Sequence, residues 1–176
     1  FENPPLDYFE KTYGFRPDQE WLDHAQKSAL KFGSGCSASF ISEDGLIMTN
    51  NHCSPGHRDN VQKDDENLAE TGFYAKTMEE ERKVPNMYAE QLTFIQDVTD
   101  EVNSVIEEAK TNKEKTEKKE KKINELVEKY NNETGLKCQF VTLYNGGKYS
   151  IYGYKRFNDV RLVFIPEQSI AAFGGD

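Results

Sequence analysis

Residues 36–53 read CSASFISEDGLIMTNNHC, and this stretch predicts a β-hairpin that leads directly into a histidine and a cysteine. In its first half, side chains of different character alternate between the two faces, which is typical of a half-buried strand. Residues 43–45, EDG, are a turn signal because glycine adopts positive φ without a steric penalty. Residues 46–50, LIMTN, form the return strand. The chain therefore arrives at His52 and Cys53 where a strand ends.

The two cysteines of this stretch predict a disulfide. Cys36 and Cys53 sit where the two strands of one hairpin come close, so the geometry for a bond is plausible. Closing the loop between them would contribute roughly 3 kcal/mol of stability. A histidine held at a strand end beside a disulfide is a rigidly mounted general base, and about 1 Å of misplacement can cost roughly a hundredfold in rate. The dipeptide alone fits an ordinary loop histidine equally well, so at this point His52 is either a general base or a loop residue without a catalytic role.

A metal site is a competing interpretation of the same segment. His52, Cys53 and His57 supply three ligands within a short span, but their spacing matches no usual zinc pattern. Only Cys138 and His24 are left elsewhere to complete such a site. We expect His24 to be solvated on the polar side of a helix, and Cys138 to be a small buried side chain within a β run. We therefore expect no metal and no cofactor.

Composition limits the classes of function. The length of 176 residues is typical of one domain, and 36% of the residues are hydrophobic, which is below the usual globular share. A net charge of −9 argues against binding to nucleic acid, which attracts basic surfaces. No apolar run approaches the roughly 18 residues of a membrane-spanning helix, so we expect no membrane span. The sequence begins at Phe1, which fits a processed or trimmed chain.

Periodicity and composition divide the chain into segments. Residues 1–33 predict N-terminal helices, and residues 34–53 form the hairpin. Residues 97–135 are rich in Lys and Glu and predict a helical insertion, with no apolar side chain between 110 and 122. A helix without an apolar face cannot bury itself, so we expect a protruding helix or a helical hairpin with a solvated tip. Residues 136–176 predict a β meander, which makes the expected fold mainly β with helical additions.

Three shorter elements complete the prediction. Residues 60–72 favour a helix that ends at Gly72. Residues 87–95, MYAEQLTFI, favour a strand. Residues 166–175 predict a short helical turn with Pro166 at its first position and glycine after its end.

The hairpin and two later blocks carry a resemblance to a known family. Residues 33–53 resemble the hairpin of chymotrypsin-clan serine peptidases, in which a strand pair ends in the catalytic His followed by a disulfide Cys. Residues 4–53, 84–102 (VPNMYAEQLTFIQDVTDEV) and 158–176 (NDVRLVFIPEQSIAAFGGD) are similar, in this order, to blocks of the bacterial dipeptidyl-peptidase 7 and dipeptidyl-peptidase 11 family. The similarity covers nearly the whole chain except its Lys/Glu-rich segment.

This resemblance implies a fold and an activity. The family is similar to chymotrypsin in its double β-barrel, carries a helical insertion, and releases dipeptides from the free N-terminus of peptides in the periplasm or outside the cell. The resemblance implies that His52 is the general base. Asn51 stands where the family has a further His, and this position supports the site without transferring the proton. The implied partners are peptide substrates, and the resemblance leaves homo-oligomerisation open.

The other catalytic residues of the family have no match in this chain. Asp176 matches the aspartate of a family GGD block, which is not the triad aspartate, and the nucleophilic serine is expected far downstream. We therefore expect residues 1–176 to be the N-terminal part of a larger peptidase catalytic domain, with the remainder of that chain as its partner. A serine needs its base and the base needs its carboxylate, so the isolated chain should be inactive.

Two other classes of function compete with this one. The first is a noncatalytic binding or assembly module that has kept the barrel and uses the Lys/Glu-rich insertion for contact. The second is an HtrA-like endopeptidase, which would require a much shorter separation between His52 and its aspartate than residues 54–175 allow.

Overall fold

The structure, a computed structural model, describes residues 4–172 and divides into two units. Unit 1 comprises residues 1–90 and 157–176, and unit 2 comprises residues 91–156. Helices hold 44% of the described residues and strands 27%, so the fold is mixed helix and sheet and the expectation of a mainly β fold is wrong. The helices between the hairpin and the C-terminal strands account for this balance. The described strands form no closed barrel.

Unit 1 begins with two predicted helices, α1 (Leu6–Tyr13) and α2 (Gln19–Ser28). The Asp18 side chain caps α2 by accepting from the backbone N–H of Trp21 at 2.8 Å. The expectation that helix continues to residue 33 is wrong, because the next residues form strand β1 (Ala29–Phe32). Pairing with a neighbouring strand and burial of Leu30 outweigh the local helix signal.

The predicted hairpin is confirmed as strands β2 (Cys36–Phe40) and β3 (Ile47–Thr49). Both pairings are antiparallel, with β2 between β1 and β3. The half-buried Phe40 and Ile47 lie opposite each other and pack on a cluster of buried apolar side chains. That cluster consists of Leu30, Val84, Met87, Ala89 and Val160. Residues distant in sequence therefore support the hairpin.

The rest of unit 1 consists of short elements. The predicted helix over 60–72 is wrong, because Gln62 is extended and separates two shorter helices. The C-terminal strands do not continue a meander, because each pairs with a strand from before the insertion, β10 with β4 and β9 with β5. Pro166 precedes the last helix by two positions and does not begin it. The bounds are α3 (Pro55–Val61), α4 (Leu68–Thr71), β4 (Phe73–Tyr74), η2 (Met78–Glu80), β5 (Arg82–Lys83), β9 (Arg161–Leu162), β10 (Phe164–Ile165) and α7 (Gln168–Ala171).

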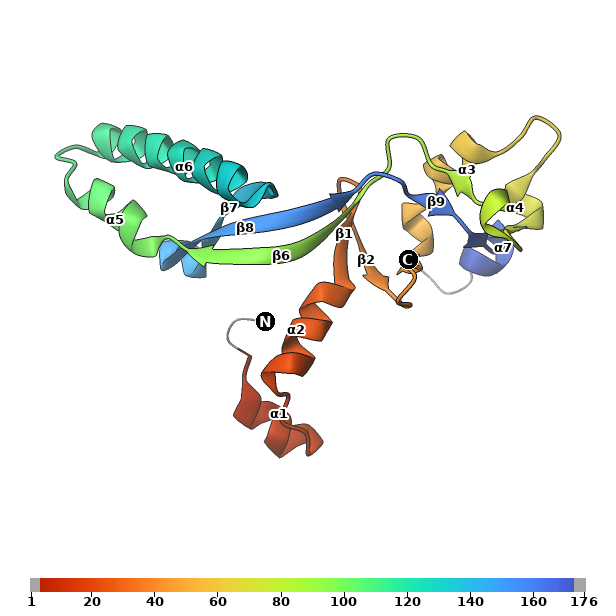
Figure 1. The fold of residues 1–176 in the computed structure, drawn as a ribbon, viewed down its shortest axis with the longest axis horizontal. Coiled ribbons are helices and arrows are strands. Elements are labelled where there is room, and N and C mark those ends of the chain that lie inside the picture. Colours follow the sequence, from red (N-terminus) through yellow and green to blue (C-terminus); the bar gives the residue numbers. More distant parts are fainter. Residues whose placement is uncertain (1–3, 173–176) are drawn as a thin grey trace. The chain divides into compact units, whose positions relative to one another are not determined.

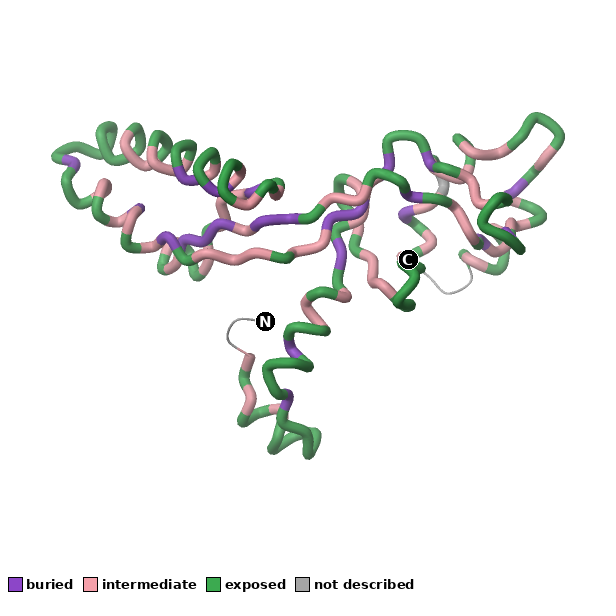
Figure 2. Tube along the Cα trace, in the orientation of Figure 1, coloured by how far each residue is buried: buried purple, intermediate pink, exposed green. Residues whose placement is uncertain are grey.

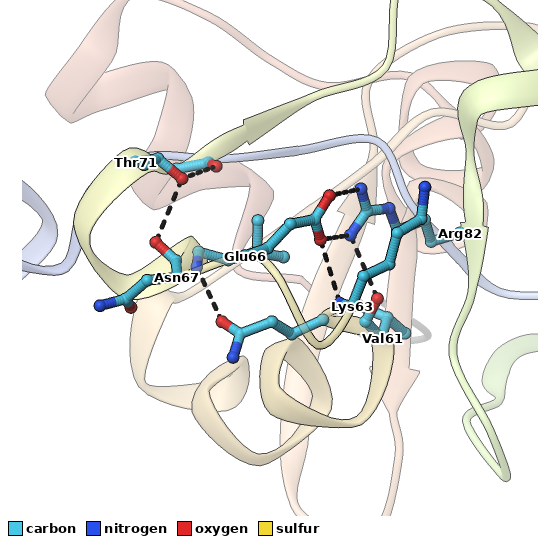
Figure 3. Close-up of polar contacts among 9 residues, drawn as sticks. Val61, Lys63, Glu66, Asn67, Thr71 and Arg82 are labelled. Atoms are coloured by element: carbon cyan, nitrogen blue, oxygen red, sulfur yellow. Dashed lines mark hydrogen bonds and ion pairs between the residues drawn. The ribbon is translucent and has the colours of Figure 1, made fainter.

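An ion pair holds the loop between α3 and α4 (Figure 3). Both oxygens of the Glu66 carboxylate accept hydrogen bonds from the Arg82 guanidinium, one at 2.6 Å, and the backbone N–H of Lys63 donates to the same carboxylate at 3.0 Å. Arg82 also donates to the carbonyl of Val61 at 3.2 Å and lies 4.3 Å above the ring of Phe73. Because two-pronged pairing fixes both side chains, β5 is tied to the segment that follows the hairpin.

Glu66→Gln should remove a pH-dependent part of the stability. Hydrogen bonds from Arg82, and then from Lys63, lower the pKa of Glu66 from 4.5 to about 2. A depressed folded-state pKa means that the contribution is fully present above about pH 4.5 and is lost as pH falls through about 2. Thermal unfolding measured across this range should show a shallower acid-side fall in Tm for Glu66→Gln. The exposed Glu70→Gln is the control, and equal slopes for Glu66→Gln and the unmodified protein would contradict the assignment.

Unit 2 is a hairpin sheet covered by two helices (Figure 1). Strand β8 lies between β6 and β7, and β7 and β8 pair antiparallel along their whole length. The predicted strand in the central block is confirmed as β6, and a two-helix hairpin follows it. The bounds are β6 (Ala89–Asp97), α5 (Thr99–Glu107), α6 (Asn112–Thr134), β7 (Lys137–Leu143), η3 (Tyr144–Gly146) and β8 (Lys148–Phe157).

The helices α5 and α6 are partly core and partly solvated. Figure 2 shows buried residues along β8 and exposed residues in the first turns of α6. The buried cluster joins both helices to the sheet, so the insertion is not solvated throughout. In the segment without apolar residues, Lys119 contacts the core by its ammonium, 4.5 Å above the ring of Tyr149 and 3.2 Å from its hydroxyl. The cluster consists of Val98, Val102, Leu126, Tyr130, Cys138, Tyr149 and Ile151.

The start of α6 follows from its own sequence. The Thr111 hydroxyl accepts from the N–H of Glu114, and the Glu114 carboxylate accepts from the N–H of Thr111, which is a capping box. These bonds allow the helix to begin in a segment that has no apolar face. No helix within residues 4–172 is both long enough and apolar enough to cross a membrane.

Leu126→Ala should destabilise unit 2 strongly. Leu126 is buried in the cluster that joins α6 to the sheet, so the truncation leaves a cavity and costs about 2–5 kcal/mol of unfolding free energy. Urea unfolding followed by circular dichroism would measure the loss. Glu125→Ala, at the exposed neighbouring position, should change the value by less than about 0.5 kcal/mol. A loss below about 1 kcal/mol for Leu126→Ala would mean that this packing is not formed in solution.

Candidate functional site

The candidate site is the turn that follows β3. The Thr49 hydroxyl donates to the carbonyl of Ser37 at 2.7 Å and ties the end of β3 to β2. Asn50 is extended, and residues Asn51–Cys53 then form one turn of 3-10 helix, η1. The backbone N–H of Cys53 donates to the carbonyl of Asn50 at 3.0 Å. The histidine follows the return strand, as the sequence predicted, but it lies within a 3-10 turn and not at the strand end itself.

A disulfide joins this turn to the beginning of the hairpin. Cys36 and Cys53 are bonded, with 6.2 Å between their Cα atoms, and Cys53 is buried. The third cysteine, Cys138, is free and buried in unit 2, as the sequence predicted. The bond crosses from β2 to η1, so it restrains the residue directly after His52.

The imidazole of His52 is exposed and lies against this disulfide. A ring nitrogen of His52 and the sulfurs of Cys36 and Cys53 all lie within 4.8 Å of one another. The two sulfurs are bonded to each other and cannot serve as thiolate ligands, so the arrangement is an imidazole beside a disulfide. His57 is not a member of this group, and the metal interpretation that combined it with His52 and Cys53 is wrong for the described residues.

The other predicted residues are not members of the group formed by His52 and the two sulfurs. His24 is exposed on α2, as expected, and His57 is half-buried in α3. Asn51 is half-buried, and its backbone carbonyl accepts two hydrogen bonds from Ser54, from the N–H at 2.9 Å and from the hydroxyl at 2.6 Å. Ser54 was not singled out by the sequence. A serine before Pro55 signals a helix cap, and this signal does not reveal that its hydroxyl points back into the turn.

Unit 1 also contains an open pocket of about 460 Å³ beside the β4–β10 pair. Its lining combines apolar side chains with the carboxylates of Asp65, Glu66 and Glu167. No predicted site residue in the described part of the chain lines this pocket, so the candidate histidine is a separate surface feature. The lining residues are Asp65, Glu66, Asn67, Leu68, Thr71, Gly72, Phe73, Tyr74, Phe164, Ile165, Pro166 and Glu167.

Comparison with known proteins identifies the class of protein to which this chain belongs, that of peptidases. Residues 1–176 match the family described as Peptidase S46, and the chain belongs to that family. It is 34% identical to dipeptidyl-peptidase 7 of Porphyromonas gingivalis over 82% of this chain and 20% of that protein. It is 32% identical to an Asp/Glu-specific dipeptidyl-peptidase of Capnocytophaga gingivalis over 94% of this chain and 24% of the relative. The family resemblance carried by the three sequence blocks is therefore confirmed.

Solved structures agree with this assignment. The crystal structure of Porphyromonas endodontalis DPP11 in complex with the dipeptide Arg-Glu superposes with a TM-score of 0.69 at 28% identity. The match covers 86% of this chain and 22% of that structure. The chain thus spans between a fifth and a quarter of the length of the relatives named here.

Non-reducing peptide mapping should recover Cys36 linked to Cys53 and Cys138 as a free thiol. The physical reason is that the first two sulfurs are bonded across the hairpin, while Cys138 is enclosed in the core of unit 2. Reduction should speed hydrogen exchange in η1 and leave β7 and β8 unchanged, which serves as the internal control. A Cys36–Cys138 link, or three free thiols under oxidising conditions, would refute the pairing.

Proposed function

We propose that this chain is part of a serine-type exopeptidase that releases dipeptides from the free N-terminus of peptides, with His52 as the general base. The observation that carries the proposal is the mounting of His52. Its ring is exposed to a reactant, while the chain on its C-terminal side is fixed by the Cys36–Cys53 bond. The names of the relatives, which are dipeptidyl-peptidases, support the reaction class.

The chemistry requires the neutral form of the imidazole. His52 takes the proton from a serine hydroxyl as that oxygen attacks the peptide carbonyl, and it then gives the proton to the leaving amine. In this proposal the serine and the orienting aspartate come from parts of the protein outside residues 1–176. Within residues 4–172 no side chain hydrogen-bonds to the His52 imidazole, which is consistent with an external orienting carboxylate.

The finer features of the proposal follow from the same elements. Strands β1, β2 and β3 would form part of the first barrel of a chymotrypsin-like pair. The disulfide supports a location in the periplasm or outside the cell, because such bonds persist in oxidising compartments. Asn51 would shape the turn through its carbonyl, which accepts from Ser54, and it would take no part in proton transfer because an amide side chain does not titrate.

His52→Ala should abolish activity in the full-length protein that contains this sequence. Loss of the base should lower kcat/KM for dipeptide release by roughly four to six orders of magnitude, as losses within a triad do. Release of a dipeptidyl fluorophore gives the rate, and intact-protein unfolding verifies the fold.

Two controls sharpen this measurement. His57→Ala, which removes the neighbouring imidazole in α3, should cost far less than His52→Ala, and the exposed His24→Ala should have no effect. The isolated 176-residue chain should release no dipeptides. Near-normal turnover by the His52→Ala enzyme, or dipeptide release by the isolated chain, would overturn the proposed function.

A further inference from the structure

The serine that follows the candidate turn departs from the usual behaviour of a residue before a helix. Ser54 is the N-cap residue of α3, and serine there normally accepts a hydrogen bond from a backbone N–H of the first helical turn. No such bond is formed, and Ser54 has φ −103° and ψ −24° in place of the extended backbone typical of a cap. Its hydroxyl donates backwards to the carbonyl of Asn51 at 2.6 Å. The Ser54 hydroxyl therefore bonds to the preceding turn and does not cap the helix.

The carbonyl that receives this bond belongs to the peptide unit that leads into His52. Because a peptide unit is planar, fixing the carbonyl of Asn51 also fixes the orientation of the His52 nitrogen. Two donors from Ser54 hold that carbonyl, its N–H at 2.9 Å and its hydroxyl at 2.6 Å, so both lone pairs of the oxygen are engaged. The Asn51 side-chain oxygen lies 3.5 Å from the same hydroxyl, a long secondary contact.

The two neighbours of His52 are thus restrained by different means. On the N-terminal side Ser54 holds the peptide unit, and on the C-terminal side the disulfide holds Cys53. The imidazole is exposed and lies beside the disulfide, so its position depends on this backbone and on its side-chain rotamer. The disulfide acts on Cys53 and does not contact the peptide unit before His52, which is held by hydrogen bonds of the turn and by the Ser54 hydroxyl.

We propose that Ser54 is a positioning residue for His52, acting through the hydrogen bond from its hydroxyl to the Asn51 carbonyl. This inference rests on the proposed function of His52 as general base. The hydroxyl does not contact substrate or the reacting proton. It limits the conformations of the turn, so its loss lowers the fraction of enzyme in which the imidazole faces the nucleophile. Departures from a local folding rule are expected at functional sites, and the diverted cap of α3 is one.

The test compares Ser54→Ala with Ser54→Thr in the full-length protein. Ser54→Ala should lower kcat by about ten- to a hundredfold, the scale of a misplacement of up to 1 Å, while KM changes by less than about threefold. Ser54→Thr keeps the hydroxyl and should retain kcat within about threefold. If Ser54→Ala does not fold, Ser54→Gly, which removes the whole side chain with its hydroxyl, replaces it in the comparison.

The matched control is Ser104→Ala in α5. The Ser104 hydroxyl also donates to a carbonyl three residues earlier, that of Glu101 at 3.0 Å, but in unit 2. The Ser104→Ala variant tests whether loss of a hydroxyl-to-carbonyl bond in itself lowers activity, and it should keep kcat unchanged.

Each outcome decides one claim. A kcat for Ser54→Ala within about twofold of normal, an equal loss in Ser54→Thr, or an equal loss in Ser104→Ala would overturn the positioning role. If Ser54→Ala has a normal kcat while His52→Ala is inactive, only the positioning role is contradicted. If His52→Ala is active, the proposed function fails first.

Discussion

The disulfide between Cys36 and Cys53 is the constraint on which the candidate site depends. The hairpin register places β2 beside β3, and the bond then returns the chain after His52 to the start of β2. Ser54 restrains the peptide unit on the other side of the histidine. The result is an exposed imidazole on an anchored backbone. General-base catalysis needs this combination, because the base must be accessible to a proton donor and must not drift from it.

The hairpin in turn relies on residues from the two ends of the chain. Val160 and Val84 share its apolar cluster with Leu30, and the short strands β9 and β10 pair with β5 and β4. Gly72, at φ +65°, permits the close approach of this pairing, since an added Cβ would lie 2.7 Å from the carbonyl of Ile165. The segment after unit 2 is therefore a structural component of the unit that carries His52.

Local patterns were sufficient for many of the elements. Alternating side chains and the glycine turn predicted β2 and β3, and the helical period predicted α1 and α2. The placement of two cysteines across one hairpin predicted their bond, and a β run of apolar residues predicted the burial of Cys138. The predictions failed where distant partners compete with local preference. Ala29–Phe32 is a strand because it pairs with β2. The C-terminal strands β9 and β10 do not extend the predicted meander, because they pair with the earlier strands β5 and β4.

By itself the sequence determined the hairpin, the order of His52 and Cys53 after it, and the family to which the chain belongs, because these depend on residue types at short spacing. Only the tertiary structure decided which strands pair across the chain, that Arg82 holds Glu66, and that the Ser54 hydroxyl turns back to Asn51. A hydroxyl or a guanidinium has several acceptors within reach in the unfolded chain. The choice among them is made by the geometry that packing imposes, and that geometry depends on contacts between residues far apart in sequence.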